Sequence, residues 1–99
     1  MIVRQGNVLL ISCPMTVDTV GELLAEGAEI LNAGNDALEL DLGRVEDADS
    51  AGISLIFEWL RQAQAQNRQL TFLNLPQSLL SLARLYGVLE MIPQAATHH

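Results

Sequence analysis

Apolar residues along this chain follow two different periods, and each period predicts a different kind of element. Between residues 37 and 42 leucine occupies every second position, which is typical of a strand with one buried face. Segments 2–5, 8–13 and 70–75 are short, apolar and bounded by turn residues, so they are also predicted to be strands. Gly6 and Asn7 separate the first two, which predicts a hairpin with a two-residue turn.

Three other segments repeat apolar residues every three or four positions and are predicted to be helices. The first begins near Thr16 or at Thr19, where Thr19 and Glu22 match a capping box, and it stops at Gly34. The second follows Ser50, and the third runs from Pro76 to Gly87. The predicted buried positions are Val20, Leu23, Leu24, Gly27 and Leu31 in the first helix, Ile53, Ile56, Phe57, Leu60 and Ala63 in the second, and Leu79, Leu82, Ala83 and Tyr86 in the third.

This order of elements predicts one α/β domain over residues 1–99. Strands that alternate with helices favour a mostly parallel sheet, and the opening hairpin makes it mixed, with four to five strands packed against helices. Residues 88–92 are predicted to form a brief final strand or a capping segment, and residues 93–99 a flexible tail. His98 and His99 are interpreted as the start of an expression tag.

The chain has a net charge of −7, with five arginines and no lysine. Nucleic acids and anionic membranes attract basic surfaces, so direct binding to either is disfavoured, and a protein partner with a basic or mixed surface fits better. No apolar run is long enough to span a bilayer and no basic leader opens the chain, which predicts a soluble, cytoplasmic protein.

The sequence gives little support for an enzymatic activity. The only histidines are the last two residues, so neither Ser50 nor the single cysteine, Cys13, has a base to activate it. No phosphate-binding or dinucleotide motif occurs, and no cofactor is predicted. A metal site made of Asp41, Glu46, Asp47 and Asp49 is a weaker interpretation than a solvated acidic loop.

Residues 47–53, Asp-Ala-Asp-Ser-Ala-Gly-Ile, form the most informative stretch, because a strand turns sharply into a helix there. Ser50 has two interpretations: a structural N-cap of the helix, or a site of phosphorylation and docking. Leu55 and Trp59 also have two interpretations, because they lie off the main apolar face of the same helix. They are either covered by a neighbouring segment or exposed as an aromatic interface patch, and we favour the patch.

The chain resembles the STAS domains, the family of the anti-sigma factor antagonists. The specific string is Leu40-Asp41-Leu42, then Val45, then Asp49-Ser50-Ala51-Gly52-Ile53. In the antagonists the hydroxyl residue at the position of Ser50 is phosphorylated by a partner kinase. Those proteins often have a second hydroxyl and a further glycine, where this chain has Ala51 and Ser54. This departure weakens the kinase-substrate interpretation.

Within the family the chain is most similar to the MlaB-type subunit of the phospholipid ABC transporter. The strings that resemble it are residues 58–61, 70–76 and 82–88. The resemblance implies a non-catalytic subunit that binds the cytoplasmic ATPase, supports the assembly and activity of a transporter that maintains outer-membrane lipid asymmetry, and meets the inner membrane only through that complex. An anti-sigma factor antagonist is the alternative. The predicted partner-binding residues are Ser50, Asp49, Ala51, Gly52, Ser54, Leu55 and Trp59.

Overall fold

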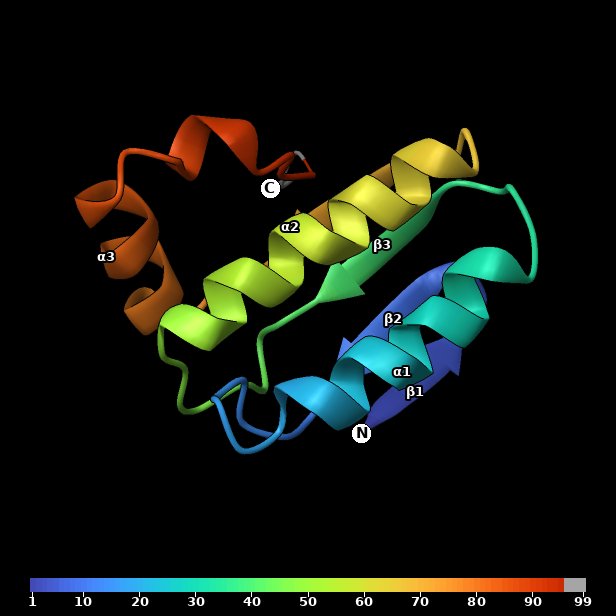
Figure 1. The fold of residues 1–99 in the computed structure, drawn as a ribbon. Coiled ribbons are helices and arrows are strands. Elements are labelled where there is room, and N and C mark those ends of the chain that lie inside the picture. Colours follow the sequence, from blue (N-terminus) through green and yellow to red (C-terminus); the bar gives the residue numbers. More distant parts are fainter. Residues whose placement is uncertain (96–99) are drawn as a thin grey trace, which may run out of the picture.

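Four strands and three helices alternate in the computed structural model, which describes residues 1–95 (Figure 1). A short 3-10 helix, η1, follows the last helix. The elements are β1 (Ile2–Gln5), β2 (Val8–Ile11), α1 (Val20–Asn32), β3 (Leu38–Asp41), α2 (Ser50–Ala65), β4 (Leu70–Leu73), α3 (Gln77–Leu85) and η1 (Leu89–Met91).

The strands form one mixed sheet in the order β1-β2-β3-β4. β1 pairs with β2 antiparallel, and β2, β3 and β4 are parallel to one another. This confirms the α/β class and the mixed, mostly parallel sheet. Gly6 opens the hairpin turn with φ 62°, a backbone conformation that glycine adopts without steric cost.

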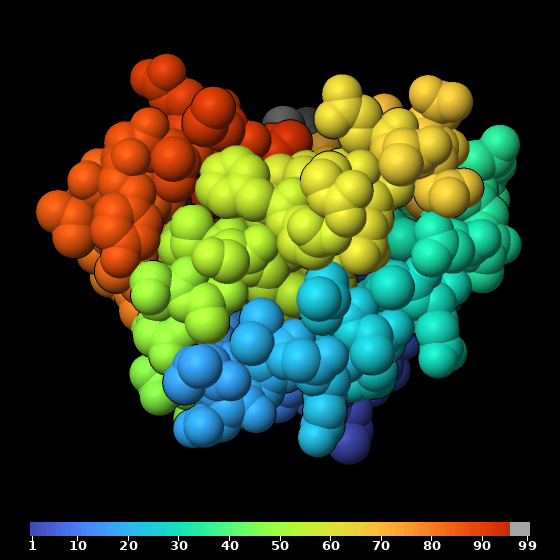
Figure 2. Space-filling view, viewed as in Figure 1, coloured from blue at the N-terminus to red at the C-terminus, as the bar shows by residue number. Residues whose placement is uncertain are grey.

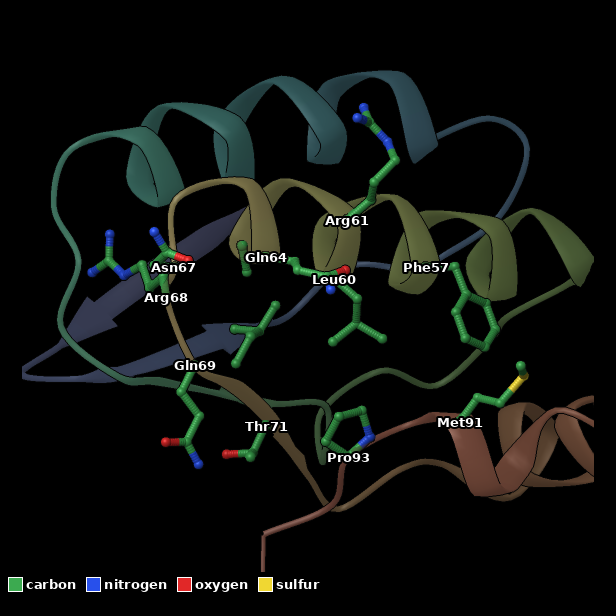
Figure 3. Close-up of a pocket in the computed structure, with 12 residues that line it drawn as sticks. Phe57, Leu60, Arg61, Gln64, Asn67, Arg68, Gln69, Thr71, Met91 and Pro93 are labelled. Atoms are coloured by element: carbon green, nitrogen blue, oxygen red, sulfur yellow. The ribbon is translucent and has the colours of Figure 1, made fainter.

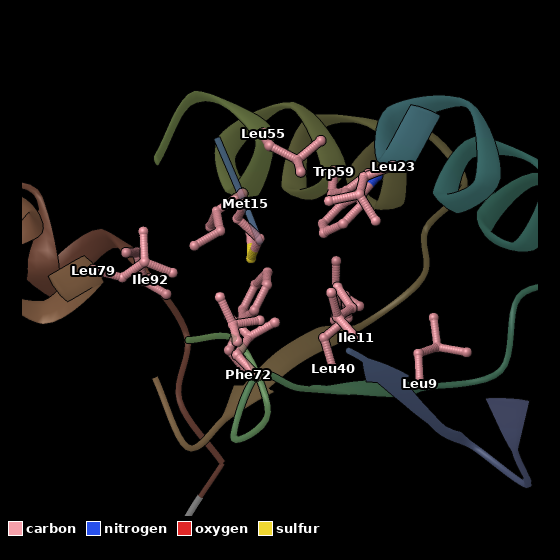
Figure 4. Packing of buried hydrophobic residues seen from close by; sticks show 14 of the residues in the cluster. Leu9, Ile11, Met15, Leu23, Leu40, Leu55, Trp59, Phe72, Leu79 and Ile92 are labelled. Atoms are coloured by element: carbon pink, nitrogen blue, oxygen red, sulfur yellow. The ribbon is translucent and has the colours of Figure 1, made fainter. Parts of the chain in front are cut away.

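One face of the sheet holds the core, as the alternating leucines predict. Leu9, Leu40 and Phe72 point from adjacent strands into the same buried layer, which α1 and α2 cover side by side (Figures 1 and 4). The other face has no helix over it within the described residues. Its side chains include Val3, Leu10 and Leu73, and Val3 on the edge strand is 46% exposed.

Leu55 and Trp59 are buried, so the prediction that they form an exposed patch is wrong. Each is only 1% exposed. α2 lies over the core layer on the sheet and also contacts both α1 and α3, and Trp59 lies in the contact with α1 (Figure 4). A helix with more than one packed side buries more than a single apolar stripe, which is why these positions belong to the core.

α1 begins after Thr19 and ends shortly before Gly34, as predicted, but the hydrogen bonds at its start differ from the prediction. The predicted capping box does not form, because the Thr19 hydroxyl faces the preceding loop. This hydroxyl donates to the Pro14 carbonyl at 2.6 Å and accepts from the Thr16 amide at 3.0 Å. At the other end Arg68 is buried and its guanidinium donates to four backbone carbonyls. These belong to Ile30 at 2.9 Å, Leu31 at 3.1 Å, Gly34 at 3.0 Å and Asp36 at 2.6 Å.

The C-terminal segment covers the outer edge of β4. Residues 89–91 form η1, so residues 88–92 are a capping segment and not a strand. The Phe72 amide donates to the Pro93 carbonyl at 2.9 Å, and the Ala95 amide donates to the Phe72 carbonyl at 3.0 Å. Residues 93–95 are therefore paired with the sheet, although the sequence places them in a tail. Residues 96–99, with His98 and His99, lie outside the described part of the chain.

Candidate functional site

The junction between β3 and α2 presents Ser50 to solvent as the first residue of the helix. The N-cap is Asp49, whose Oδ1 accepts the Ala51 amide at 2.8 Å. The structural interpretation of Ser50 as the cap is therefore wrong. Because Asp49 satisfies the free amide, the hydroxyl of Ser50 is left at the surface without a capping role.

Asp49 also ties two loops together beneath Ser50. Its second carboxylate oxygen accepts the Val17 amide at 3.1 Å, and its own amide donates to the Met15 carbonyl at 3.2 Å. The Met15 amide in turn donates to the Asp47 carbonyl at 2.9 Å. Both oxygens of Asp49 are thus engaged, which gives this predicted partner-binding residue a positioning role for Ser50 and Val17.

A shallow hollow of about 410 Å³ lies over the junction. Val17 and Tyr86 border it and are 70% and 51% exposed, which is unusual for large apolar side chains. Ser50 and Ser54, one helical turn apart, are exposed between them. We call Val17, Ser50, Ser54 and Tyr86 the Ser50 surface.

The structure brings together only some of the residues predicted to bind a partner. Ser50 and Ser54 are exposed and Ala51 is half-buried, whereas Gly52 is buried. A Cβ atom at Gly52 would lie 2.9 Å from the Met15 carbonyl oxygen, so glycine at this position lets the helix approach the neighbouring loop.

Sequence reasoning missed Val17 and misplaced Tyr86. Tyr86 was assigned to the buried side of the last helix, but α3 ends at Leu85 and Tyr86 follows it as the C-cap, turned outward. Val17 lies in a polar loop, and a lone valine among turn residues is the signal that points to it. Both side chains reach the Ser50 surface from segments that are distant in sequence.

The acidic loop before α2 is held by hydrogen bonds within the loop and to neighbouring segments. Asp41 Oδ1 accepts the Gly43 amide at 2.9 Å and the Asn74 side-chain amide at 3.1 Å. Glu46 and Asp47 are exposed. Within residues 1–95 no three potential ligand side chains are grouped so that they could hold a metal ion.

Comparisons with known proteins agree with this architecture. The family model described as "Mlab, STAS domain" matches residues 2–93. The chain therefore belongs to the STAS domain family, as its motif predicts. No curated protein matches.

Several solved structures share the fold. A protein from Thermotoga maritima described as an anti-sigma factor antagonist has a TM-score of 0.79 at 14% identity, over 98% of this chain and 86% of its own. The anti-sigma factor antagonist SpoIIAA in its unphosphorylated form has a TM-score of 0.73 at 15% identity, over 97% of this chain and 87% of its own. The phosphorylated form of SpoIIAA from Bacillus has a TM-score of 0.70 at 15% identity, over 97% of this chain and 90% of its own.

No helix among the described residues combines the length and apolar character needed to cross a bilayer.

Proposed function

We propose that this chain is a non-catalytic accessory subunit that binds the cytoplasmic ATPase of an ABC transporter. The transporter would move phospholipid between the membranes of a Gram-negative envelope. The observation that supports this most is the Ser50 surface, a solvent-exposed hydroxyl flanked by exposed apolar side chains and placed by a rigid junction. The Mlab description of the matching family model supports an accessory role.

The composition of the Ser50 surface suits a protein partner. Tyr86 offers a large side chain with both apolar and polar character, and such residues dominate binding energy at interfaces. Val17, which also lines the hollow, adds an exposed apolar contact. A flat, open hollow of this kind does not enclose a small substrate, and the two serines have no histidine nearby in the described chain. These features support a role in binding.

Partner charge and location follow from the acidity of the chain. With a net charge of −7, the protein is complementary to a basic patch on the ATPase and is repelled by anionic lipid. It would reach the cytoplasmic side of the inner membrane only through the transporter. Binding would support the assembly and ATPase activity of the complex.

A charge placed at Ser50 tests this function. In Ser50→Asp the new carboxylate lies at the helix N-terminus, where the helix dipole favours it, so the fold is preserved. Because the partner would cover the apolar side chains around Ser50, the new carboxylate would lose its hydration there, and this cost outweighs any attraction to a basic patch elsewhere on the ATPase. We expect at least about a tenfold loss of affinity for the purified ATPase subunit, which corresponds to roughly 1.4 kcal/mol. Tyr86→Ala is expected to weaken binding as well.

Asn35→Asp is the matched control, because it adds the same charge in the exposed loop before β3, whereas Ser50 follows β3 at the other end of the sheet. Binding that is equally strong for wild type, Ser50→Asp and Tyr86→Ala would refute the proposal. Trp59 is unsuitable as a test position, because it is buried and its replacement would perturb the fold.

A second candidate function is that of an anti-sigma factor antagonist controlled by phosphorylation of Ser50. It is favoured by the exposed hydroxyl of Ser50 and by the shared fold with SpoIIAA, which has been solved in both phosphorylated and unphosphorylated forms. A phosphate here would meet the positive end of α2 but also the nearby acids Asp47 and Asp49, so it would act through its charge on the partner and not by refolding the domain. Mass spectrometry of Ser50 in the native host, together with the identity of the bound protein, separates the two functions.

A further inference from the structure

The hollow in the Ser50 surface has an apolar interior. Ile53, which is buried, and Ala51, which is half-buried, line it together with the exposed side chains of Val17 and Tyr86. Figure 2 shows the first turns of α2, in green, exposed between α3, in orange, and the loop before α1, in blue. Its volume of about 410 Å³ is near the lower end of the range of about 300–1,000 Å³ for ligand pockets, a size that suits a single side chain of a partner.

The position of Val17 is set by the same junction that presents Ser50. Asp49 Oδ2 accepts the Val17 amide at 3.1 Å, and the Thr19 hydroxyl closes the loop by donating to the Pro14 carbonyl at 2.6 Å. Because the backbone around the hollow is held in the free protein, little conformational entropy is lost when a partner binds. The hollow is therefore a preformed site.

Charge decides between an apolar and a basic side chain as the occupant. Among the described residues, Asp49 is the one charged residue that lines the hollow, and its two oxygens accept the Ala51 amide at 2.8 Å and the Val17 amide at 3.1 Å. A lysine or arginine placed there would compete with these amides for the carboxylate and lose its hydration against apolar walls. The exposed carboxylates of Asp18 and Asp47 lie outside the lining, so basic groups of a partner fit around the hollow and not in it.

We infer that the hollow receives one apolar side chain of the ATPase, such as leucine or phenylalanine, which packs against Ile53, Val17 and Tyr86. This inference rests on the proposed function and names the chemistry of the partner at the same surface. The hydroxyls of Ser50 and Ser54 then bond to polar groups of the partner around this anchor. An apolar anchor in a preformed hollow, surrounded by polar groups, is the usual composition of an interface hot spot.

The affinity of Val17→Asp for the purified ATPase subunit tests the chemistry of the occupant. This variant places a carboxylate where the apolar side chain would pack, so we expect binding to be at least about tenfold weaker, since the charge would be covered without a counterion. A lysine or arginine in the hollow would instead be attracted to the new carboxylate. Binding of Val17→Asp that is as tight as that of wild type, or tighter, would overturn the inference.

Tyr86→Ser removes apolar surface from the hollow without adding a charge. We expect it to weaken binding about fivefold. Leu85→Ser is the matched control, because Leu85 is the preceding residue, is 76% exposed and does not line the hollow. This control is expected to bind as wild type does, and equal losses of affinity in the two variants would count against the inference.

Val17→Ser is expected to weaken binding about fivefold for the same reason. Its control is Met91→Ser, because Met91 is 65% exposed, close to the 70% of Val17, but lines a different hollow. Figure 3 shows Met91 in that larger hollow, of about 700 Å³, beside the C-terminal half of α2. We expect Met91→Ser to bind as wild type does. All these side chains are largely exposed, so the midpoints of thermal unfolding should stay close to that of wild type.

The outcomes separate the inference from the proposed function. If Val17→Asp, Val17→Ser and Tyr86→Ser bind as wild type does while Ser50→Asp binds more weakly, the apolar anchor is refuted and the proposed function stands. If wild type forms no complex with the ATPase subunit, both fail.

Discussion

The indole of Trp59 lies directly against the backbone of Gly27, so that α1 and α2 meet at their closest approach. A methyl group at Gly27 would come within 2.6 Å of Cε2 of the indole. The indole Nε1 has no hydrogen-bond acceptor among the described residues. Glycine at this position allows the largest core side chain to fill the space between the two helices and the sheet.

Gly27→Ala is therefore expected to destabilise the protein by about 1–3 kcal/mol, because the core is overpacked. Gly21→Ala is the matched control on the same helix. A Cβ atom there meets nothing within 4 Å, and alanine is the better helix former, so we expect a gain of about 0.5 kcal/mol. Urea unfolding measures both, and equal effects at the two positions would contradict the Trp59 contact.

Asp49 is expected to matter more for stability than Ser50. Asp49→Ala removes the N-cap bond to Ala51 and the bond to the Val17 amide, at a cost of about 1–2 kcal/mol. Ser50→Ala is expected to change stability by less than about 0.5 kcal/mol, because the hydroxyl is exposed and does not cap the helix. Chemical unfolding of both variants checks this order, and a larger loss for Ser50→Ala would contradict the assignment of the cap.

Arg68 is expected to be the arginine on which the fold depends most. Arg68→Ala leaves the carbonyls at the end of α1 and in the loop before β3 without their donor, at a cost of roughly 3 kcal/mol. Arg68→Lys keeps the charge but loses the planar donor group, so it recovers only part of the stability. The exposed Arg61→Ala is the control and should change stability little; the measurement is the midpoint of thermal unfolding.

The Glu58–Arg61 pair predicts a small pH dependence. The hydrogen bond from Arg61 holds the pKa of the Glu58 carboxyl below its ordinary value, despite slight desolvation, which acts in the opposite direction. A lowered pKa in the folded state means that the contribution is present above the ordinary value of 4.5 and is lost as the pH falls through the folded value.

Glu58→Gln should therefore be slightly less stable than wild type at about pH 7, and this difference should shrink as the pH falls below about 4. Because both side chains are at the surface, the effect is small and is weakened by salt. Denaturant titrations at several pH values test it. If the stability difference between wild type and Glu58→Gln grew as the pH fell, the ion pair would contribute to stability in the direction opposite to the one expected.

The order of strands and helices and the main core leucines could be predicted from local pattern. Leu38, Leu40 and Leu42 alternate in sequence and are all buried, because a strand turns every second side chain to the same face. The hairpin follows from Gly6, whose positive φ is a local property of the turn. The STAS motif likewise lies within a few contiguous residues.

The candidate site could be predicted only in part. Ser50 and Ser54 were found from the motif, and both are exposed. Leu55 and Trp59 were assigned to the surface because a single apolar stripe explains only one packed side of a helix, whereas α2 covers the core layer and also contacts α1 and α3. Phe57 and Leu60 pack against the core as the pattern predicts, but each is only half-buried.

The sequence by itself determined the class of fold, the β3–α2 junction and the acidity of the surface, since each depends on local periodicity, a contiguous motif or a sum over residues. Only the tertiary structure decided that Asp49 caps the helix, that Val17 and Tyr86 flank Ser50, and that Trp59 faces Gly27. These relationships join residues from separate elements, and their geometry is set by how two helices and a sheet pack together. No periodicity within one segment contains that information.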